Sequence, residues 1–169
     1  MKKLYFITGP AGVGKTTISE TIAKKLSKSV SINGDEIYHF VKGGYISPWQ
    51  EGNHLDLFWE NSISLINNCL NKNYDVIFNY IIDKNKINEL KNVFNSFEVK
   101  FVVLMADESI IVKRDSQRPV NCQMGKRSLI LLNDFKSQNF EEKYILDTSN
   151  LTIEETINII ENEPRFILK

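Results

Sequence analysis

A glycine-rich run near the start of the chain has the residue types and the spacing that bind phosphate. It comprises Gly9, Pro10, Ala11, Gly12, Val13, Gly14, Lys15, Thr16 and Thr17. The first eight of these match G-x-x-x-x-G-K-S/T at every position. Glycine lets the backbone curl so that successive N–H groups point at one anion, and a following helix adds its own free N–H groups. We expect Lys15 to contact the β- and γ-phosphates of a nucleoside triphosphate and Thr16 to bind Mg²⁺.

The alternative for this run is a glycine-rich turn whose lysine is merely exposed. The sequence context favours phosphate binding, because the run follows a strand-like segment, residues 4–8, and precedes a helical pattern. ATP is expected by default among the triphosphates. The guanine-reading pattern Asn-Lys-x-Asp is absent from the sequence, and residues 83–86 read Asp-Lys-Asn-Lys instead.

Five short apolar segments are expected to be the strands that position this chemistry. They are residues 4–8, 29–33, 75–80, 99–105 and 144–147, with helical patterns between them. Continuous apolar strands that alternate with helices predict an α/β fold, with a five-stranded parallel sheet and helices on both faces. Ligands bind beyond the carboxyl ends of such strands. The segments that follow the strands are therefore expected to meet at one edge: residues 9–16, 33–36, 79–83 and 106–107.

Composition argues against several classes of protein. The 169 residues are 42% hydrophobic and 25% charged, as in an ordinary globular domain. Basic and acidic residues number 21 each, so the overall charge favours neither nucleic acid nor an anionic membrane. No apolar run approaches the ~20 residues of a membrane span, and Cys69 and Cys122 form no CxxC pair. We expect a single cytoplasmic domain over residues 1–169, with no nucleic-acid or membrane partner.

Three segments in order resemble the nucleoside-monophosphate-kinase-like group of small P-loop kinases. They are the loop at 9–16, the Asn-Gly-Asp-Glu segment at 33–36, and an arginine-bearing helix after the fourth strand. The resemblance covers nearly the whole chain and is closest to the branch with chloramphenicol phosphotransferase, gluconokinase, shikimate kinase and the zeta toxins. It implies a three-layer P-loop NTPase fold with a small lid at about 114–127 and an acceptor region at about 35–60. The implied activity is transfer of the γ-phosphoryl group of ATP, with Mg²⁺, to a hydroxyl group of a small molecule.

The same resemblance gives Asp35 a catalytic function. In such kinases an aspartate just past the second strand faces the phosphoryl acceptor and accepts the hydroxyl proton or orders a water on Mg²⁺. Asp35 is therefore expected in catalysis and, with Thr16, in metal binding, while Glu36 is a weaker candidate. The alternative is that Asp35 only caps a helix that starts near Glu36.

Arg114 and Arg118 are the candidate lid arginines. Their i, i+4 spacing would place them on one face of a helix. The resemblance implies that they approach the phosphates during transfer, where guanidinium groups would stabilise developing charge alongside Lys15. Lys126 and Arg127 are further candidates for the lid. The alternative is a solvent-exposed basic helix end.

Asn79 departs from the family pattern at the end of the third strand. Many relatives carry an aspartate there that holds Mg²⁺ through water, and an amide lacks that charge. Either Asp35 and Thr16 suffice for the metal, or Asp83 reaches the site, or catalysis is weak. This position is the main argument in the sequence for a slow ATPase or a nucleotide-binding switch that has no acceptor.

The acceptor region contains aromatic side chains and a loop between about residues 41 and 52. Candidates for contact with an acceptor are Tyr45, Trp49 and His54, with Tyr80 from the third strand. Phe40, Phe58 and Trp59 are expected in the core instead. Because Lys42 is the basic residue of this segment, a neutral or zwitterionic acceptor is favoured over a nucleotide. The family's substrate signatures are missing, so the acceptor stays unnamed, and an antibiotic is one alternative.

Overall fold

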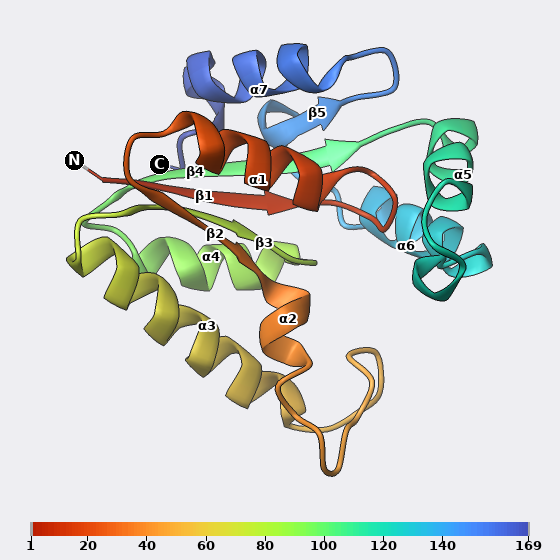
Figure 1. The fold of residues 1–169 in the computed structure, drawn as a ribbon, viewed down its shortest axis with the longest axis horizontal. Helices are drawn as coiled ribbons and strands as arrows, with labels where there is room; N and C mark the ends of the chain where they lie inside the picture. Colours follow the sequence, from red (N-terminus) through yellow and green to blue (C-terminus); the bar gives the residue numbers. More distant parts are fainter. Residues whose placement is uncertain (1, 169) are drawn as a thin grey trace.

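The computed structural model describes residues 2–168. Five strands within this range form one sheet (Figure 1). The strands are β1 (Lys3–Thr8), β2 (Ser29–Asn33), β3 (Asp75–Asn79), β4 (Glu98–Met105) and β5 (Ile145–Asp147). They pair in parallel in the order β2-β3-β1-β4-β5. The predicted α/β class and five-stranded parallel sheet are confirmed.

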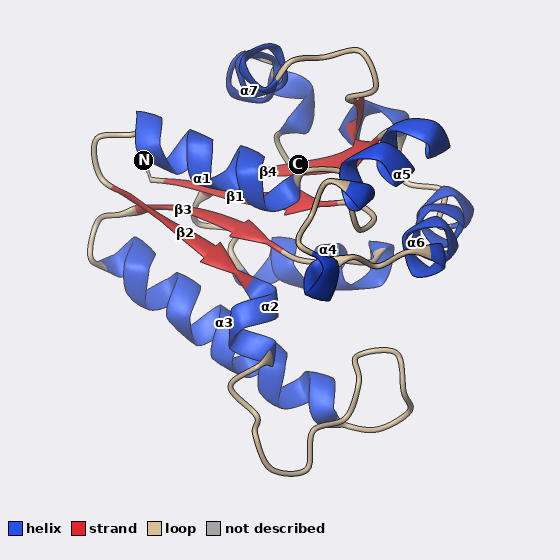
Figure 2. Cartoon of the chain, turned by 45° about the vertical axis from the view of Figure 1, so that its right-hand side comes forward, coloured by secondary structure: helices blue, strands red, loops and turns tan. Residues whose placement is uncertain are grey.

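Helices cover both faces of this sheet, which gives three layers (Figure 1). The helices are α1 (Lys15–Lys25), α2 (Gly34–Tyr38), α3 (His54–Asn71), α4 (Lys84–Val93), α5 (Glu108–Ser116), α6 (Lys126–Ser137) and α7 (Ile153–Asn162). Short 3₁₀ turns occupy Val120–Cys122, Glu142–Tyr144 and Pro164–Phe166. The pair α1 and α7 covers one face, and α3 and α4 cover the other. Figure 2 shows α5 and α6 beyond the carboxyl ends of the strands.

The central strand β1 explains why the strands read as continuous apolar runs. Successive side chains of a strand point to opposite faces. Leu4 and Phe6 accordingly belong to the core beneath α3 and α4, whereas Tyr5 and Ile7 belong to the core beneath α1 and α7. Both faces of the sheet are therefore buried, as a parallel sheet requires.

Side-chain caps fix where several helices begin. Asp83 accepts hydrogen bonds from the N–H groups of Asn85 and Lys86 at the start of α4. Thr152 and Glu155 form a capping box at the start of α7. α5 begins after Asp107, whose side chain makes no capping hydrogen bond.

Four predicted strand ends differ by one residue from the structure, and one predicted core residue is wrong. β1 and β4 begin one residue earlier than predicted, at Lys3 and Glu98. β3 ends at Asn79, one residue before Tyr80, and Tyr144 lies in a 3₁₀ turn before β5. Phe40 was expected in the core but is 69% exposed. Its helix ends at Tyr38, so Phe40 leaves the helical phase that would have turned it inward.

The helices of residues 2–168 were also compared with the requirements for crossing a bilayer. None of them combines sufficient length with sufficient hydrophobicity to do so.

Candidate functional site

The glycine-rich run forms a loop between β1 and α1, as predicted. Gly9, Gly12 and Gly14 have φ values of 139°, 82° and 104°, which side-chain-bearing residues rarely adopt. A Cβ atom on Gly9 would lie 2.2 Å from the carbonyl oxygen of Leu104, so glycine is required there for packing as well. No side chain caps α1. Its first N–H groups and the positive end of its dipole are thus available to an anion.

Lys15 is folded back onto this loop. Its Nζ donates hydrogen bonds to the carbonyl oxygens of Gly9 at 2.9 Å and of Pro10 at 3.0 Å. The pKa of Lys15 is lowered to about 8, chiefly by burial; the nearby negative charge of Asp35 acts to raise it, and the positive charge of Arg118 acts to lower it. Burial therefore disfavours the charged form of Lys15, and an anionic ligand in the site would stabilise that form.

A cavity of about 520 Å³ lies against the loop. Its walls come from the loop and α1, from α2 and the segment after β3, from the predicted lid and α6, and from α7 with the segment that leads into it. The lining residues are Ala11, Gly12, Val13, Gly14, Lys15, Thr16, Thr17, Ile18, Asp35, Ile81, Arg114, Gln117, Arg118, Met124, Leu131, Thr148, Leu151, Ile153 and Thr156. Gly9 and Pro10 are buried behind this wall, where their carbonyl groups hold Lys15.

Asp35 lines this cavity from the first turn of α2. The helix begins at Gly34, and its cap is Asn33, whose side chain accepts a hydrogen bond from the N–H of Asp35 at 3.1 Å. The alternative in which Asp35 caps the helix is therefore wrong, and its carboxylate is free to serve the cavity. Glu36 is exposed and does not line the cavity.

Gly34 allows Asp35 to occupy this place. A Cβ atom on Gly34 would lie 2.6 Å from the ring of Tyr80, so only glycine lets α2 pack on that ring. Burial raises the pKa of Tyr80, and the nearby charge of Asp35 raises it further. Tyr80 is thus a buried support beneath α2, and it does not line the large cavity.

Thr16 and Asn79 supply oxygen atoms next to the loop. The Thr16 hydroxyl donates a hydrogen bond to Asn79 Oδ1 at 3.5 Å, and Asn79 is 2% exposed. Within residues 2–168 there is no cluster of three or more His, Cys, Asp or Glu side chains that could hold a metal. Mg²⁺ needs no such cluster, because it keeps several waters and binds through one or two carboxylates and the phosphates of a nucleotide. The oxygen donors of Thr16, Asp35 and Asn79 fit that ion.

Arg114 is held against the loop. Its guanidinium donates to the carbonyl oxygen of Val13 at 3.2 Å, and to the hydroxyl and carbonyl oxygens of Thr148 at 3.1 and 3.0 Å. These bonds join the phosphate loop, α5 and the segment after β5. They leave Arg114 bound to Val13 and Thr148, on the side of the cavity toward α7.

Arg118 has a different environment. The predicted shared helical face is wrong, because α5 ends at Ser116 and Arg118 lies beyond it. Both arginines nevertheless line the large cavity. Arg118 pairs with the buried Asp115 at 3.5 Å and is partly exposed, so its guanidinium can still reach a ligand.

A match to known proteins agrees with this geometry. A family model described as an AAA domain matches residues 6–145. The chain belongs to the AAA domain family. A comparison with curated proteins finds no match.

Solved structures similar to this AAA domain include three bacterial proteins. A sugar kinase from Janibacter sp. has a TM-score of 0.69 at 15% identity, over 94% of this chain and 91% of that one. The tunicamycin resistance protein of Deinococcus radiodurans has 0.65 at 20% identity, over 95% and 94%. A gluconokinase from Sinorhizobium meliloti has 0.64 at 18% identity, over 92% and 87%. The predicted resemblance to the small P-loop kinases is confirmed at the level of fold.

The acceptor loop, which we define as residues 41–53, lies between α2 and α3 of the AAA domain. Tyr45 and His54 line a second cavity, of about 190 Å³, beside this loop. Trp49 is 61% exposed and stacks on Arg127, whose guanidinium carbon lies 3.6 Å from the centre of a Trp49 ring. The acceptor loop and the predicted lid are therefore in contact through these two side chains.

Sequence reasoning missed Asp115, which holds the lid together. Its carboxylate accepts hydrogen bonds from the N–H groups of Met124 and Gly125. Burial acts to raise the pKa of Asp115, but those hydrogen bonds and Arg118 outweigh it, so the pKa is lowered. In the sequence Asp115 lies among basic residues, and nothing there indicates that its carboxylate accepts hydrogen bonds from residues 124 and 125.

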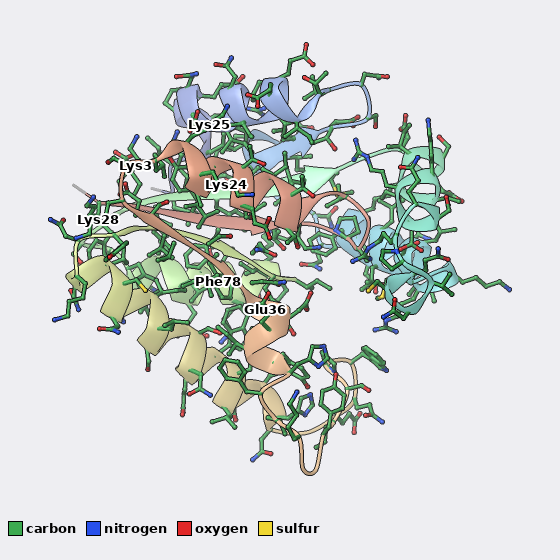
Figure 3. All side chains as sticks on the ribbon, viewed as in Figure 1. Lys3, Lys24, Lys25, Lys28, Glu36 and Phe78 are labelled. Carbon is green, nitrogen blue, oxygen red and sulfur yellow. The ribbon has the colours of Figure 1, made fainter. Side chains whose placement is uncertain are left out.

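Cations of the AAA domain are not spread evenly around its cavity. Figure 3 shows that Lys3, Lys24, Lys25 and Lys28 lie toward the end of the sheet and of α1 that is away from the phosphate loop. Lys25 is paired with Glu154 at 2.5 Å. The basic groups that line the cavity are Lys15, Arg114 and Arg118.

Proposed function

We propose that this protein is an ATP-dependent kinase that phosphorylates a hydroxyl group of a small molecule in the presence of Mg²⁺. The observation that carries the proposal is that the phosphate loop, Asp35 and Arg118 line one cavity. A nucleotide-binding switch needs the loop alone. A phosphotransferase also needs a base on one side of the γ-phosphate and a movable cation beside it.

The two ends of the cavity suit the two substrates. Thr148, Leu151 and Ile153 line the end toward α7, where a flat adenine ring would contact apolar side chains and backbone groups. Arg114 would act there as a positioning residue, because it fixes Thr148 against the loop. Asp35 and Ile81 line the end where the acceptor hydroxyl would approach.

Phosphoryl transfer would use the groups in these places. The acceptor oxygen forms a bond to the γ-phosphorus while the bond from that phosphorus to the β–γ bridging oxygen breaks, which releases ADP. The Asp35 carboxylate takes the proton of the acceptor hydroxyl. Lys15 and Arg118 stabilise the charge on the phosphoryl oxygens. Thr16, Asp35 and Asn79 would hold Mg²⁺, which supplies neutralisation of phosphate charge.

The test is ADP release from Mg·ATP in the presence of pooled acceptors. The pools contain neutral sugars, amino alcohols and antibiotics, since one fold neighbour is a tunicamycin resistance protein. We expect one pool to stimulate ADP release and Asp35→Ala to lower the stimulated rate by at least about a hundredfold. Glu36→Ala is the matched control, because Glu36 neighbours Asp35 but lies outside the cavity.

The buried Asn79 favours a second candidate, a slow ATPase without an acceptor. Release of ADP that no pool stimulates, and that persists in Asp35→Ala, would support this candidate against the kinase.

A further inference from the structure

Three apolar side chains line the same large cavity as Asp35. They are Ile81, which follows β3, Met124, which precedes α6, and Leu131 of α6. We call these three residues the apolar wall. Ile81 is 37% exposed, so a large apolar side chain is open to the cavity beside the proposed catalytic base. Apolar lining around a few polar groups is typical of a surface that contacts a ligand.

The register of the sheet places Ile81 next to Asp35. The last residues of β2 and β3 pair in register, and Asp35 and Ile81 each lie two residues beyond that pair. The residues between are in contact as well, because a Cβ atom on Gly34 would lie 2.6 Å from the ring of Tyr80. The two strands therefore deliver a carboxylate and an apolar side chain to neighbouring places on one cavity.

α6 lies along the segment that follows Ile81 and carries the rest of the apolar wall. The side chain of Gln138 accepts a hydrogen bond from the N–H of Lys84 at 3.2 Å. Phe135 belongs to the same core cluster as Ile82. Leu131 lies one turn before Phe135, so it shares that face of the helix and extends it to the cavity.

Backbone donors around the apolar wall are already used within the protein. On either side of Ile81, the N–H of Tyr80 donates to a carbonyl group of β1 and the N–H of Ile82 donates to the Thr8 hydroxyl. The N–H of Met124 donates to the carboxylate of Asp115. Buried hydroxyl groups need partners. A polyol laid on this wall would therefore leave hydroxyl groups unpaired, whereas an alkyl group would not.

The cations of the cavity are engaged too. Lys15 binds carbonyl groups of the phosphate loop, Arg114 binds backbone groups on both sides of it, and Arg118 pairs with Asp115. In the proposed reaction Lys15 and Arg118 turn to the phosphoryl oxygens. Among residues 2–168 that line the cavity there is no further cation for an anionic group on the acceptor.

We propose that the acceptor is an amphiphilic alcohol, which presents its hydroxyl group to Asp35 and places an uncharged alkyl or aryl group on the apolar wall. This inference rests on the proposed kinase function and names the class of substrate for the same site. It makes Ile81 a specificity-determining residue. It also sets this chain apart from a kinase for sugars or other polyols, although fold neighbours include a sugar kinase and a gluconokinase.

The experiment uses the full chain with saturating Mg·ADP and three primary alcohols of increasing length, propanol, butanol and pentanol. Saturation-transfer NMR gives the dissociation constant of each alcohol. Affinity should rise by up to about fourfold with each added methylene group, because that group leaves water for the apolar wall. Erythritol, which has the carbon chain length of butanol and a hydroxyl group on every carbon, should bind at least about tenfold more weakly than butanol.

Substitutions at Ile81 test whether the apolar wall causes this trend. Ile81 is not a core residue, so Ile81→Ala should leave the fold intact and reduce the gain per methylene group to about twofold or less. Ile81→Asn should weaken pentanol binding and strengthen erythritol binding, which loss of folding would not do. Ile130→Ala is the matched control and should behave like the wild type, because Ile130 is exposed on α6 and does not line the cavity.

The wall and the kinase proposal can fail separately, because binding in the presence of ADP requires no phosphoryl transfer. Equal affinities along the alcohol series, or the same gradient in Ile81→Ala as in the wild type, would overturn the amphiphilic acceptor. This holds even if a polyol stimulates ADP release through Asp35, a result that would support the kinase. Failure of Mg·ATP to bind in calorimetry would instead overturn the proposed function.

Discussion

The buried ammonium group of Lys15 makes nucleotide affinity depend on pH. Its pKa is lowered to about 8 in the free protein, chiefly by burial. A bound triphosphate favours the charged form, so binding must take up a proton once Lys15 is partly neutral. The affinity for Mg·ATP should be constant below about pH 8 and fall above it, by up to about tenfold per pH unit.

Calorimetry in two buffers with different ionisation enthalpies checks this expectation. The apparent enthalpy should differ between buffers at pH 9, which reports proton uptake, and agree at pH 6.5 once ATP ionisation is allowed for. Proton uptake that is the same at both pH values would contradict a lowered pKa for Lys15.

Asn79 is the other residue whose chemistry can be tested directly. Asn79→Asp places a carboxylate beside Thr16, in a position that is 2% exposed. Without Mg²⁺ the added charge should lower the melting temperature, because burial disfavours a carboxylate that no metal ion neutralises. With Mg·ADP the variant should need about tenfold less Mg²⁺ for half-saturation.

The control for this substitution is Asn33→Asp, which adds the same charge on the neighbouring strand. Asn33 pairs in register with Asn79 but caps α2, and aspartate caps a helix as well as asparagine does. The Mg²⁺ requirement of Asn33→Asp should stay close to that of the wild type. An Asn79→Asp protein with an unchanged Mg²⁺ requirement would remove Asn79 from the proposed metal site.

At the scale of elements, the lid depends on the tie that Asp115 makes to residues 124 and 125. Asp115→Asn replaces a carboxylate oxygen with an NH₂ group that cannot accept from those N–H groups. The variant should lose about 1–3 kcal/mol of stability and expose the segment around Arg118 to trypsin. Thermal unfolding and timed proteolysis measure the two effects, with the exposed Asp134→Asn of α6 as the control.

The lowered pKa of the Asp115 carboxylate also predicts the direction in which the stability of the protein changes with pH. The pKa of Asp115 is lower in the folded protein than its ordinary value of 3.8, because hydrogen bonds and Arg118 outweigh burial. Its stabilisation is therefore present above about pH 3.8 and is lost as the pH falls through the folded-state pKa. Asp115→Asn should remove this part of the acid dependence.

Local sequence signals predicted most of the elements. The apolar runs located both ends of all five strands to within one residue. Short helices were harder to predict, because α2 has only five residues and its cap is Asn33, two residues before the alternative cap Asp35. Phe40 was misplaced for that reason.

The candidate site could be predicted only where its residues are contiguous. The phosphate loop is one segment, so the sequence contains the whole motif. The bonds of Arg114 to Thr148 join residues 34 positions apart, and nothing in either segment indicates the other. The support of α2 by Tyr80 likewise depends on how two strands lie side by side, which a single sequence does not contain.

At the scale of the whole molecule, Trp49 and Arg127 connect the acceptor loop with the lid. The loop precedes α3 and Arg127 lies in the first turn of α6, so the contact joins two elements that are far apart in the sequence. Stacking of a guanidinium on an indole contributes about 0.5–1 kcal/mol at an exposed site. Trp49→Ala should therefore speed hydrogen exchange in both segments, although only one is mutated.

Hydrogen exchange read by mass spectrometry checks this coupling. Arg127→Lys keeps the charge but loses the planar group, so it should reproduce part of the effect. Trp49→Phe keeps a ring and should be milder than Trp49→Ala. If Trp49→Ala quickens exchange in the acceptor loop alone, the two segments move independently.

The chain has two tryptophans, and their surroundings are opposite. Trp59 is 9% exposed in the core, while Trp49 lies 61% exposed against a guanidinium. Replacing Trp59 with phenylalanine would leave Trp49 as the single tryptophan, positioned where the acceptor loop contacts the predicted lid. The emission wavelength of Trp49 would then report any movement of the acceptor loop against the predicted lid when a substrate binds. Candidate acceptors could therefore be screened by the shift in emission before any turnover is measured.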